Sequence, residues 1–262
     1  MTAEEIQENL QFKDRCVLNL DGVKLDTPVY RVYPIDRLIQ LFTDKKNTLV
    51  KPAMWDDPFE NLVFQQTATM STGETVSFDG IREKYYGQCW TLNQDESDAL
   101  WRIYSPDKKG VRVKTTLRKL WDSFYNTNYK WAMISFFVGK INYETEQEIK
   151  IFFEAPENLD MIFDTSGTGS VQTLLIKRME FQHENEIRLI YAGHSDTDNL
   201  AQRIYQYDID PNDLLDELLF DPRFDNTTYP TMTALLRALG YAKTIDKSKL
   251  YQLPNFILRL NH

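Results

Sequence analysis

The chain has 262 residues, enough for one large domain or two small ones with a substantial buried core. Hydrophobic residues make up 42% of it and charged residues 26%, which excludes the disordered and fibrous classes. The net charge of -9 argues against a protein that coats nucleic acid by bulk electrostatics, although a local basic groove stays open.

The beginning of the chain and its cysteines bear on the cellular compartment. The first residues, MTAEEIQENLQFKDR, lack a signal pattern, and no apolar run approaches the roughly 18 residues of a membrane span. Cys16 and Cys89 lie far apart and outside any CxxC spacing, so we expect free thiols in a reducing compartment. The sequence therefore predicts a cytoplasmic protein without a membrane partner.

The first part of the chain predicts a helix followed by a strand, a helix and a strand. Residues 3–14 fit a short polar helix, and TPVYRVYP then alternates as a strand. PIDRLIQLFTDKK begins with proline and repeats apolar residues at helical spacing, whereas NTLVK returns to a strand before the turn DDPFE. Residues 65–80 are small and polar, which predicts a loop or hairpin.

The middle of the chain alternates strands and helices. YYGQCWTLNQ predicts a buried strand, DESDALWRIYS a helix capped by Ser97, KGVRVKT a strand, and residues 117–125 a helix. ISFFVGKINY and EIKIFF are expected to be two strands split by an acidic turn.

The last third predicts a hairpin and a helix. DTSGTGS is expected to be a loop, and VQTLLIKRMEF and EIRLIYAG to be the two arms of a hairpin joined by QHEN. YPTMTALLRALGY predicts a helix that Gly240 ends.

These elements contain no internal repeat and no linker, so they predict a single α+β domain. We expect a helical brace over residues 1–27, a core over 28–192 and a C-terminal extension of helix and strand over 193–262. The expected architecture is a central β-sheet with flanking helices.

Standard cofactor motifs are missing from the sequence. It contains neither GxxxxGK[ST] nor a GxGxxG between a strand and a helix, and SGTGS lacks the phosphate-binding lysine. The three histidines form no zinc pattern, so we expect no metal site, and no GxSxG with a histidine in reach indicates a serine hydrolase.

Two positions suggest specific chemistry in the first part of the chain. Arg31 lies in the middle of a half-buried strand, where an arginine usually pairs with a carboxylate or a phosphate. Asp56, Asp57 and Glu60 surround a proline turn beside Trp55, and their simplest role is capping and turn hydrogen bonds.

Glu184 and Glu186 are the candidate catalytic pair. Residues two apart on a strand point to one face, so both side chains would converge with Arg188. Two close carboxylates raise each other's pKa unless a cation lies nearby, which is one way to tune a catalytic base. The alternative is an exposed row of charges in which Arg188 neutralises Glu186.

Four ordered segments together resemble a widespread bacterial family of domains of unknown function: YRVYPIDRLIQLF, DDPFEN, CWTLNQDESDALWRIYSPDKKGVRV and KRMEFQHENEIRLIY. The hallmarks of that family are an opening Tyr-Arg/Lys-Tyr strand, an N-D-P-F-E turn, a Trp-x-x-Tyr helix and a final Glu-x-Glu-x-Arg. Asp56, Trp90 and Phe181 stand where the family usually has Asn, Phe and Trp. The resemblance spans about residues 28–192 and implies no particular activity.

The order of elements also resembles the ADP-ribosyltransferase superfamily, and this resemblance implies that the central sheet is a mixed or split antiparallel sheet. Members hold NAD with an Arg or His of the first core strand, and the last Glu of a late strand binds the nicotinamide ribose. The resemblance implies that Arg31 holds NAD, with Tyr33 and Trp55 as walls of its site. It further implies that Glu186 contacts the ribose and that Glu184 activates the acceptor.

Other features of that superfamily are less complete here. In that superfamily a Ser, Thr or Tyr on the second strand lines the nicotinamide pocket. No Ser-Thr-Ser follows the second strand here, and the nearest residues that could take this place are Lys51, Trp55 and Ser71. The resemblance implies an NAD-dependent effector, such as a bacterial toxin or an anti-phage defence protein. It would modify protein or RNA and have an antitoxin or chaperone as a partner.

Two other classes of function stay open. A metal-dependent nuclease of the restriction type would use an Asp and a Glu-x-Lys on neighbouring strands, and EIK at residues 148–150 fits the second half of that pattern. A binding or regulatory protein without chemistry would use the charged strand faces as a partner surface.

Overall fold

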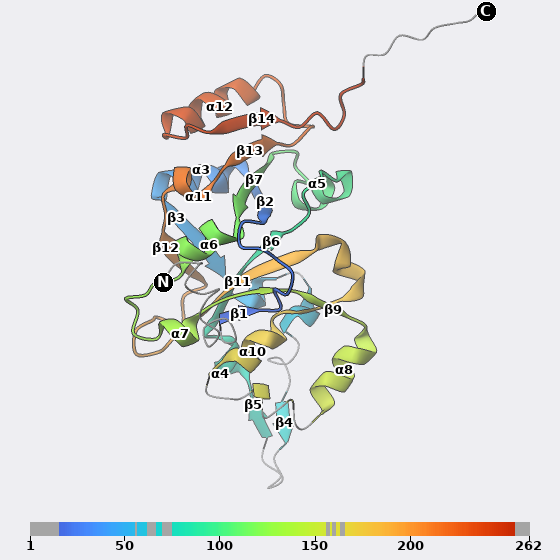
Figure 1. The fold of residues 1–262 in the computed structure, drawn as a ribbon, viewed down its shortest axis with the longest axis vertical. Coiled ribbons are helices and arrows are strands. Elements are labelled where there is room, and N and C mark those ends of the chain that lie inside the picture. The colour runs from blue at the N-terminus through green and yellow to red at the C-terminus, as the bar shows by residue number, and fades with distance from the viewer. Residues whose placement is uncertain are drawn as a thin grey trace, which may run out of the picture.

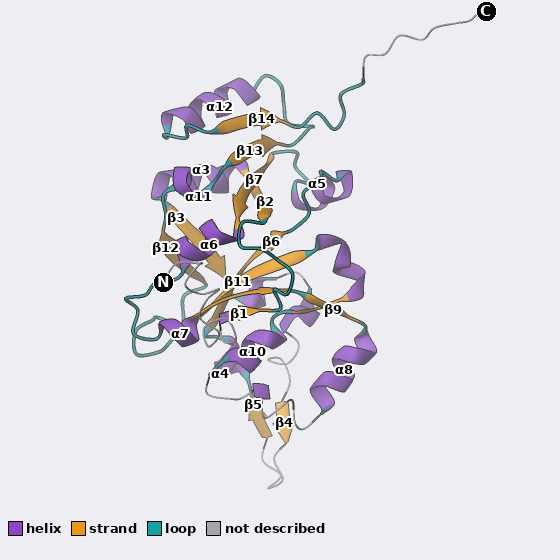
Figure 2. Cartoon of the chain, in the orientation of Figure 1, coloured by secondary structure: helices purple, strands orange, loops and turns teal. Residues whose placement is uncertain are grey.

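The computed structural model describes residues 16–55, 57–61, 67–69, 75–155, 158, 161–162 and 166–254. Within these residues ten strands form one mixed sheet with helices around it, so the fold is a single α+β domain, as the sequence predicts (Figures 1 and 2). The helix expected over residues 3–14 falls outside the described part of the chain.

The large sheet has a main path and a side branch. The main path runs in the order β1 (Val17–Leu18), β8 (Phe136–Lys140), β11 (Glu186–Ala192), β6 (Tyr85–Thr91), β2 (Pro28–Pro34), β7 (Gly110–Thr116), β13 (Glu217–Phe220) and β14 (Thr244–Lys247). The branch consists of β3 (Lys46–Val50) and β12 (Ile204–Asp208). Because β12, β13 and β14 join the strands of the core, the C-terminal extension belongs to the same sheet.

Strand β6 is the point at which this sheet splits. One of its edges pairs with β11 along all seven residues of β6. On the other edge, β2 reaches it only where Tyr30 lies opposite Thr91, and β3 only where Val50 lies opposite Gly87. Strands β2 and β3 therefore diverge from the two ends of β6, and the sheet forks between them.

A buried amide group bridges this fork. The Gln88 side chain lies between the two arms, where its Nε2 donates to Asn47 Oδ1 at 2.7 Å and to the Tyr33 hydroxyl at 3.2 Å. Its Oε1 accepts from Trp90 Nε1 at 2.8 Å. Since a buried amide is costly to leave without partners, these bonds hold β2 and β3 at a defined separation from β6.

Helices and short turns cover the sheet. The helices are α3 (Ile35–Asp44), α4 (Asp79–Arg82), α5 (Asp98–Tyr104), α6 (Leu117–Phe124), α7 (Ala132–Ser135), α8 (Glu146–Glu154), α10 (Thr168–Thr173), α11 (Pro211–Leu214) and α12 (Tyr229–Ala238). The 3-10 turns are η1 (Pro52–Met54), η2 (Pro58–Asn61) and η4 (Met179–Glu184). Two small sheets pair β4 (Thr67–Thr69) with β5 (Thr75–Ser77), and β9 (Asn142–Glu144) with β10 (Ile176–Arg178).

The apolar core has two parts. The larger cluster takes in the buried faces of α3 and α6 and the strands that they cover, with Leu38 and Trp121 fully enclosed. The smaller cluster lies around α10 and includes Val171, Leu174 and Ile190. Strand β11 contributes to both clusters, which explains why all seven of its residues are buried.

Several local expectations are confirmed. Ser97 caps α5 by accepting a hydrogen bond from the backbone N–H of Leu100. Helix α12 ends just before Gly240, which has a φ of +98° that favours glycine. Cys16 is buried, where its thiol donates to the Met133 carbonyl, and Cys89 is half-buried.

The structure corrects the expectation for residues 146–154. EIKIFF is part of helix α8 and not a strand, because the Thr145 hydroxyl accepts from the Glu148 backbone N–H and the Glu148 carboxylate accepts from the Thr145 backbone N–H. Glu148 and Lys150 therefore lie on a helix. The two-strand arrangement that a restriction-type nuclease requires is not found at this motif.

The structure also corrects the expected hairpin of residues 171–192. Part of DTSGTGS and of the following run forms helix α10, and β10 pairs in parallel with β9 rather than with β11. Instead of a tight QHEN turn, η4 joins β10 to β11. The segment fails as a hairpin because its first arm is helical at the start and its short strand finds a different neighbour.

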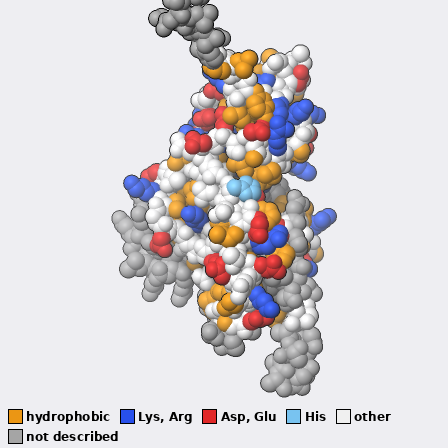
Figure 3. All heavy atoms as spheres, turned by 90° about the vertical axis from the view of Figure 1, so that its right-hand side faces the viewer, with side chains coloured by type: hydrophobic (Ala, Val, Ile, Leu, Met, Phe, Trp, Pro, Cys, Tyr) orange, Lys and Arg blue, Asp and Glu red, His pale blue; other side chains and the backbone are white. Residues whose placement is uncertain are grey.

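Among the described residues, no helix is both long enough and apolar enough to cross a membrane. On the face shown in Figure 3, acidic and basic side chains are interspersed among apolar ones. That face carries no broad patch of one charge, in keeping with the net charge of the sequence.

Candidate active site

A pocket of about 440 Å³ lies at the fork of the sheet. Its wall comes from both sides of the fork, with residues of β2, of β6, of the η1 and η2 turns, of α5 and of the segment from β10 to β11. Six aromatic side chains line it: Tyr30, Trp55, Trp90, Trp101, Tyr104 and Phe181. The pocket therefore combines flat apolar walls with polar groups that come from distant parts of the chain, as ligand sites usually do.

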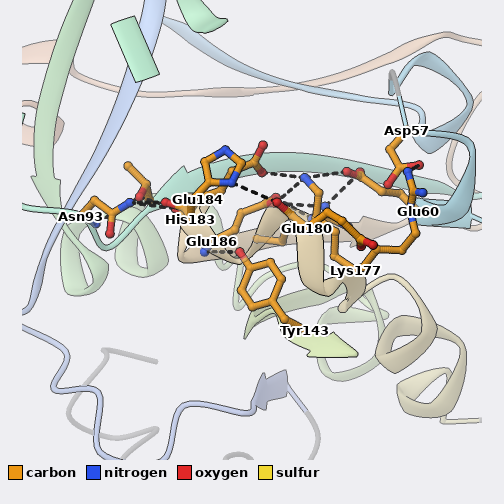
Figure 4. Close-up of polar contacts among 12 residues, drawn as sticks. Asp57, Glu60, Asn93, Tyr143, Lys177, Glu180, His183, Glu184 and Glu186 are labelled. Carbon is orange, nitrogen blue, oxygen red and sulfur yellow. Dashed lines mark hydrogen bonds and ion pairs between the residues drawn. The ribbon is translucent and has the colours of Figure 1, made fainter. Parts of the chain in front are cut away.

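A cluster of buried charges forms one side of this pocket. The ammonium group of Lys177 lies 2.7 Å from Glu60 Oε1, 2.6 Å from Glu184 Oε2 and 3.3 Å from Glu186 Oε2. Figure 4 shows the three carboxylates converging on this lysine from η2, from the end of η4 and from the start of β11. All four side chains line the pocket.

Arg188 supports the cluster from behind. Its Nε lies 2.6 Å from Glu186 Oε1, and one terminal nitrogen lies 2.9 Å from Glu60 Oε2. The other terminal nitrogen donates to the Leu174 carbonyl at 2.7 Å, and the guanidinium carbon lies 4.3 Å from the centre of the Trp55 ring. Arg188 is 0% exposed, so its charge depends on these partners.

These contacts decide the charge of Glu186. Burial raises the pKa of this carboxyl group, but the charges and hydrogen bonds of Arg188 and Lys177 outweigh burial and lower the pKa to about 2. Burial lowers the Arg188 pKa, but the Glu186 and Glu60 charges and the hydrogen bond to Glu186 together outweigh burial and raise it. At neutral pH the cluster contains an ionised carboxylate that is 3% exposed.

The backbone around Glu184 explains how the pair converges. Glu184 ends η4 and Glu186 begins β11, while Asn185 between them is left-handed with a φ of +44°. The Glu184 carbonyl accepts hydrogen bonds from Thr91 Oγ1 and from Asn93 Nδ2, the latter at 3.4 Å. The two glutamates therefore meet through a turn that β6 and its following loop fix, and not through one regular strand.

The burial of these residues overturns the alternative of an exposed row of charges. Glu184 is 9% exposed and Glu186 is 3% exposed, and every residue of β11 is buried. Arg188 does neutralise Glu186, as that alternative held, but inside the protein and together with Lys177.

Arg31 and Tyr33 lie on β2, which β6 separates from β11 in the sheet. Arg31 lines the pocket, and one terminal nitrogen donates to the Cys89 carbonyl at 2.5 Å. Its Nε is buried and meets no hydrogen-bond acceptor within the described residues. Tyr33 is 8% exposed, and its ring centre lies 5.1 Å from the Arg31 guanidinium. The pocket wall includes Arg31, whereas Tyr33 supports that side chain from the core.

The DDPFE turn is held against the cluster. The backbone N–H of Phe59 donates to Asp57 Oδ1, which gives the turn hydrogen bond that the sequence predicts. The same oxygen pairs with Arg178 at 3.1 Å. Trp55 and Asp57 both line the pocket, whereas Asp56 lies outside the described residues.

The three candidate residues after the second strand, Lys51, Trp55 and Ser71, differ in their relation to the pocket. Lys51 is buried away from the pocket wall, 3.3 Å from Glu83 and 4.5 Å from the centre of the Tyr86 ring. Trp55 is in the wall, and Ser71 belongs to the part of the chain that is not described. Trp55 therefore meets the charge cluster, whereas Lys51 does not.

Sequence reasoning missed Lys177 as a member of the site and gave Glu60 only a structural role. Both are 7% exposed in their side chains and touch each other. The signal for Lys177 was a cationic residue within the apolar run TLLIKRMEF, but nothing local shows which carboxylate it meets. No group of three or more His, Cys, Asp or Glu residues in the described chain could hold a metal ion.

The arrangement can stabilise positive charge and can accept protons. Glu60, Glu184 and Glu186 face two cationic side chains, so the carboxylates outnumber the cations in a site largely shielded from water. Electrostatic interactions are stronger in such a site than in bulk water. Partial burial and the Glu184 charge also raise the pKa of Tyr104 at the pocket wall.

Residues 100–189 match a family described as "Protein of unknown function (DUF2971)". The match runs from α5 into β11 and includes Lys177, Glu184 and Glu186. It confirms the resemblance to a domain-of-unknown-function family and names no activity. No curated protein shows significant sequence similarity to the chain.

Solved structures of DarT from Thermus sp. 2.9 are distantly similar to the chain. The complex with NAD+ has a TM-score of 0.39 and 11% identity, over 86% of this chain and 97% of DarT. The complex with ADP-ribosylated ssDNA has a TM-score of 0.39 and 10% identity, over 86% and 95%. For the carba-NAD+ complex the TM-score is 0.37 at 11% identity, over 86% and 97%. These values describe a distant likeness and assign no activity.

Proposed function

We propose that this protein transfers ADP-ribose from NAD to an acceptor in the pocket at the fork. The observation that carries the proposal is that Glu184 and Glu186 line one pocket together with Arg31, although these residues come from opposite ends of the core. Flat aromatic walls and a buried, ionised carboxylate are what cleavage of the nicotinamide–ribose bond requires.

Glu186 is the carboxylate proposed to act at the ribose. As the bond between ribose C1′ and nicotinamide N1 breaks, its electron pair stays on nicotinamide and positive charge develops on the ribose. A carboxylate whose pKa is about 2 is fully ionised at neutral pH and stabilises this charge. Because Arg188 holds Glu186 by two contacts, the carboxylate needs little reorganisation during the reaction.

The other pocket residues divide the remaining tasks. Arg31 has a buried Nε without a hydrogen-bond acceptor in the described chain, so its guanidinium can bind the pyrophosphate of NAD while Tyr33 supports it from the core. Trp55 is the proposed wall beside the dinucleotide. Glu184 accepts the proton that the acceptor loses as its nucleophile bonds to C1′.

The acceptor and the biological role are part of the proposal. We infer a protein or RNA acceptor and a role as a cytoplasmic toxin or anti-phage effector, with an antitoxin or chaperone as partner. This role is supported by the resemblance of the sequence motifs alone.

The test is transfer from labelled NAD in a cell lysate, followed separately in protein, RNA and single-stranded DNA. Wild type is compared with Glu186→Gln, which removes the charge and keeps the shape, and with Glu180→Gln, an exposed glutamate on the same η4 turn. We expect Glu186→Gln to lose about 100-fold or more of the transfer rate, and Glu180→Gln to retain it.

Two outcomes contradict the proposal. If wild type neither binds NAD nor transfers label, the transferase function is wrong, and the alternative of a binding protein without chemistry takes its place. If Glu186→Gln and Glu180→Gln transfer label equally well, the chemistry lies elsewhere than in the charge cluster.

A further inference from the structure

Two consecutive residues of β10 hold the η2 turn in place. Lys177 pairs with Glu60 at 2.7 Å, and Arg178 pairs with Asp57 at 3.1 Å. Because successive residues of a strand point to opposite faces, the two cations reach the same turn from different sides. The Lys177 side chain is 7% exposed and that of Arg178 is 27% exposed.

The two ion pairs differ in what else they touch. Lys177 also reaches Glu184 and Glu186, and its ammonium lies 4.8 Å from the centre of the Phe181 ring. Arg178 stacks over Phe59 and Phe181, at 4.3 Å and 5.3 Å, and the ion pairs of the described chain link it to Asp57 alone. Both cations stabilise the turn, but only the inner one contacts the candidate catalytic carboxylates.

Neutralisation of buried carboxylates during folding does not by itself explain the position of Lys177. Arg188 already supplies two contacts to Glu186 and one to Glu60, whereas no ion pair of the described residues joins it to Glu184. Lys177 is the cation that reaches all three carboxylates. Figure 4 shows it between Glu184 and Glu186 on one side and Glu60 on the other.

We propose that Lys177 is a positioning residue, whose ammonium group fixes Glu184 and Glu186 at the pocket wall and ties both to the η2 turn through Glu60. This proposal rests on the proposed transferase function, because positioning has meaning only for a site that reacts. It gives the DDPFE turn a role in the site that goes beyond its own turn hydrogen bonds.

The groups that face Glu186 determine what removal of Lys177 would do. They come from every element packed around it: Arg188 of β11, Lys177 of β10, Cys89 of β6, Glu184 of η4, Glu60 of η2, Tyr143 of β9 and Tyr104 of α5. Without Lys177, Arg188 is the remaining cation beside three carboxylates. The pKa of Glu186 then rises from about 2, because like charges are no longer offset.

The test compares Lys177→Met with Arg178→Met. Both changes remove one cation of β10 and one ion pair to the η2 turn, and Arg178 serves as the matched control because it touches neither Glu184 nor Glu186. The first readout needs no NAD: the carboxyl carbons of 13C-labelled glutamate are titrated by NMR. We expect the Glu186 midpoint to rise by about one pH unit or more in Lys177→Met and to stay in place in Arg178→Met.

The second readout is the steady-state rate of NAD turnover. We expect Lys177→Met to lower kcat about tenfold or more while KM for NAD changes less than about threefold, since the carboxylates lose their placement and the dinucleotide keeps Arg31. Lys177→Arg restores part of kcat because it returns the charge. If Lys177→Met does not fold, Glu60→Gln takes its place, with a smaller decrease of kcat in the same direction.

The outcomes separate this proposal from the proposed function. An unchanged Glu186 midpoint in Lys177→Met, or an equal rise in Arg178→Met, overturns the positioning role even when wild type transfers ADP-ribose. A kcat decrease of the same size in both variants overturns it as well. If the midpoint rises but wild type turns over no NAD, the proposed function is wrong and the positioning role is lost with it.

Discussion

The two ends of β11 both hold a carboxylate, and they do so by different means. At the N-terminal end, Glu186 is held by cationic side chains: Arg188 at 2.6 Å and Lys177 at 3.3 Å. This end lines a pocket, and Glu184 and Glu60 bring further negative charge to it.

At the C-terminal end, Asp198 is held by neutral donors. The Tyr129 hydroxyl donates to it at 2.9 Å, the Tyr191 hydroxyl at 3.0 Å and the backbone N–H of His194 at 2.8 Å. The ring of Tyr191 stacks on that of Tyr205 with 3.7 Å between the ring centres. Here the carboxylate fastens the loop after β11 to the aromatic core.

The difference shows which carboxylate is part of the architecture and which is available for chemistry. Neutral donors satisfy a carboxylate at modest cost, whereas a buried ion cluster adds little net stability because desolvation offsets the attraction. The charged end of β11 is therefore poorly explained by stability, and its position on a pocket supports a functional role.

The largest expected effect comes from Arg188→Met, which leaves buried carboxylates with less compensation. We expect the free energy of unfolding to fall by about 3–5 kcal/mol, as for other broken buried ion pairs. Urea denaturation measures it, with Arg178→Met as the partly exposed control. A loss below about 1 kcal/mol would mean that the cluster tolerates unpaired charge, and the contrast between the two ends would disappear.

The second-largest expected effect is the loss of stability when acid protonates Glu186 at the charged end of β11. The folded pKa of Glu186 is depressed to about 2, so its contribution to stability is complete above the unfolded pKa and is lost as the pH falls through the folded value. The loss between about pH 4.5 and about pH 2 amounts to about 3 kcal/mol for this group. Comparing the acid unfolding of wild type with that of Glu186→Gln isolates it, because the Gln variant lacks this component. Parallel acid profiles of the two proteins would contradict the assignment.

Asp198→Asn tests the neutral end with a smaller expected effect. The amide keeps one oxygen for the tyrosine hydroxyls but turns N–H groups toward other donors, so we expect a loss of about 1–2 kcal/mol. NAD binding, measured by calorimetry, should match that of wild type because Asp198 is not part of the pocket wall. Weaker binding in this variant would show that the two ends of β11 are coupled.

The smallest expected effect is that of Tyr129→Phe. It removes one hydroxyl from Asp198, which keeps the donors of Tyr191 and His194. We expect a loss of about 0.5 kcal/mol, seen as a small decrease in the thermal midpoint. A loss as large as that of Arg188→Met would mean that neutral donors are as critical as the buried cations.

The sequence predicts the local parts of this site and not the distant contacts. Arg188 follows Glu186 by two positions on a strand, so alternation places them together. The left-handed turn at Asn185 is not visible in such a pattern, nor is the pairing of β10 with β9 that brings Lys177 to the carboxylates. Contacts between segments far apart in the chain depend on strand neighbours that periodicity does not encode.

The incorrect strand at EIKIFF has a different cause. The capping pattern of Thr145 and Glu148 is readable in the sequence and favours a helix, whereas the alternation of apolar residues in EIKIFF favours a strand. Most strands of the large sheet were predicted because their periodicity is strong and turn residues bound them. The fork itself was expected from a resemblance, since no local property of β6 shows that it has two partners on one edge.

The fork is where we expect the sheet to open most easily. Each arm meets β6 at a single residue pair, and the Gln88 amide and the Tyr33–Asn47 hydrogen bond add side-chain links between the arms. We therefore expect the mouth of the pocket to widen by a local fluctuation that leaves the long ladders of the sheet intact. Backbone N–H groups in the middle of β6 that point toward the fork should exchange their hydrogens faster than the N–H groups of β6 that point toward β11.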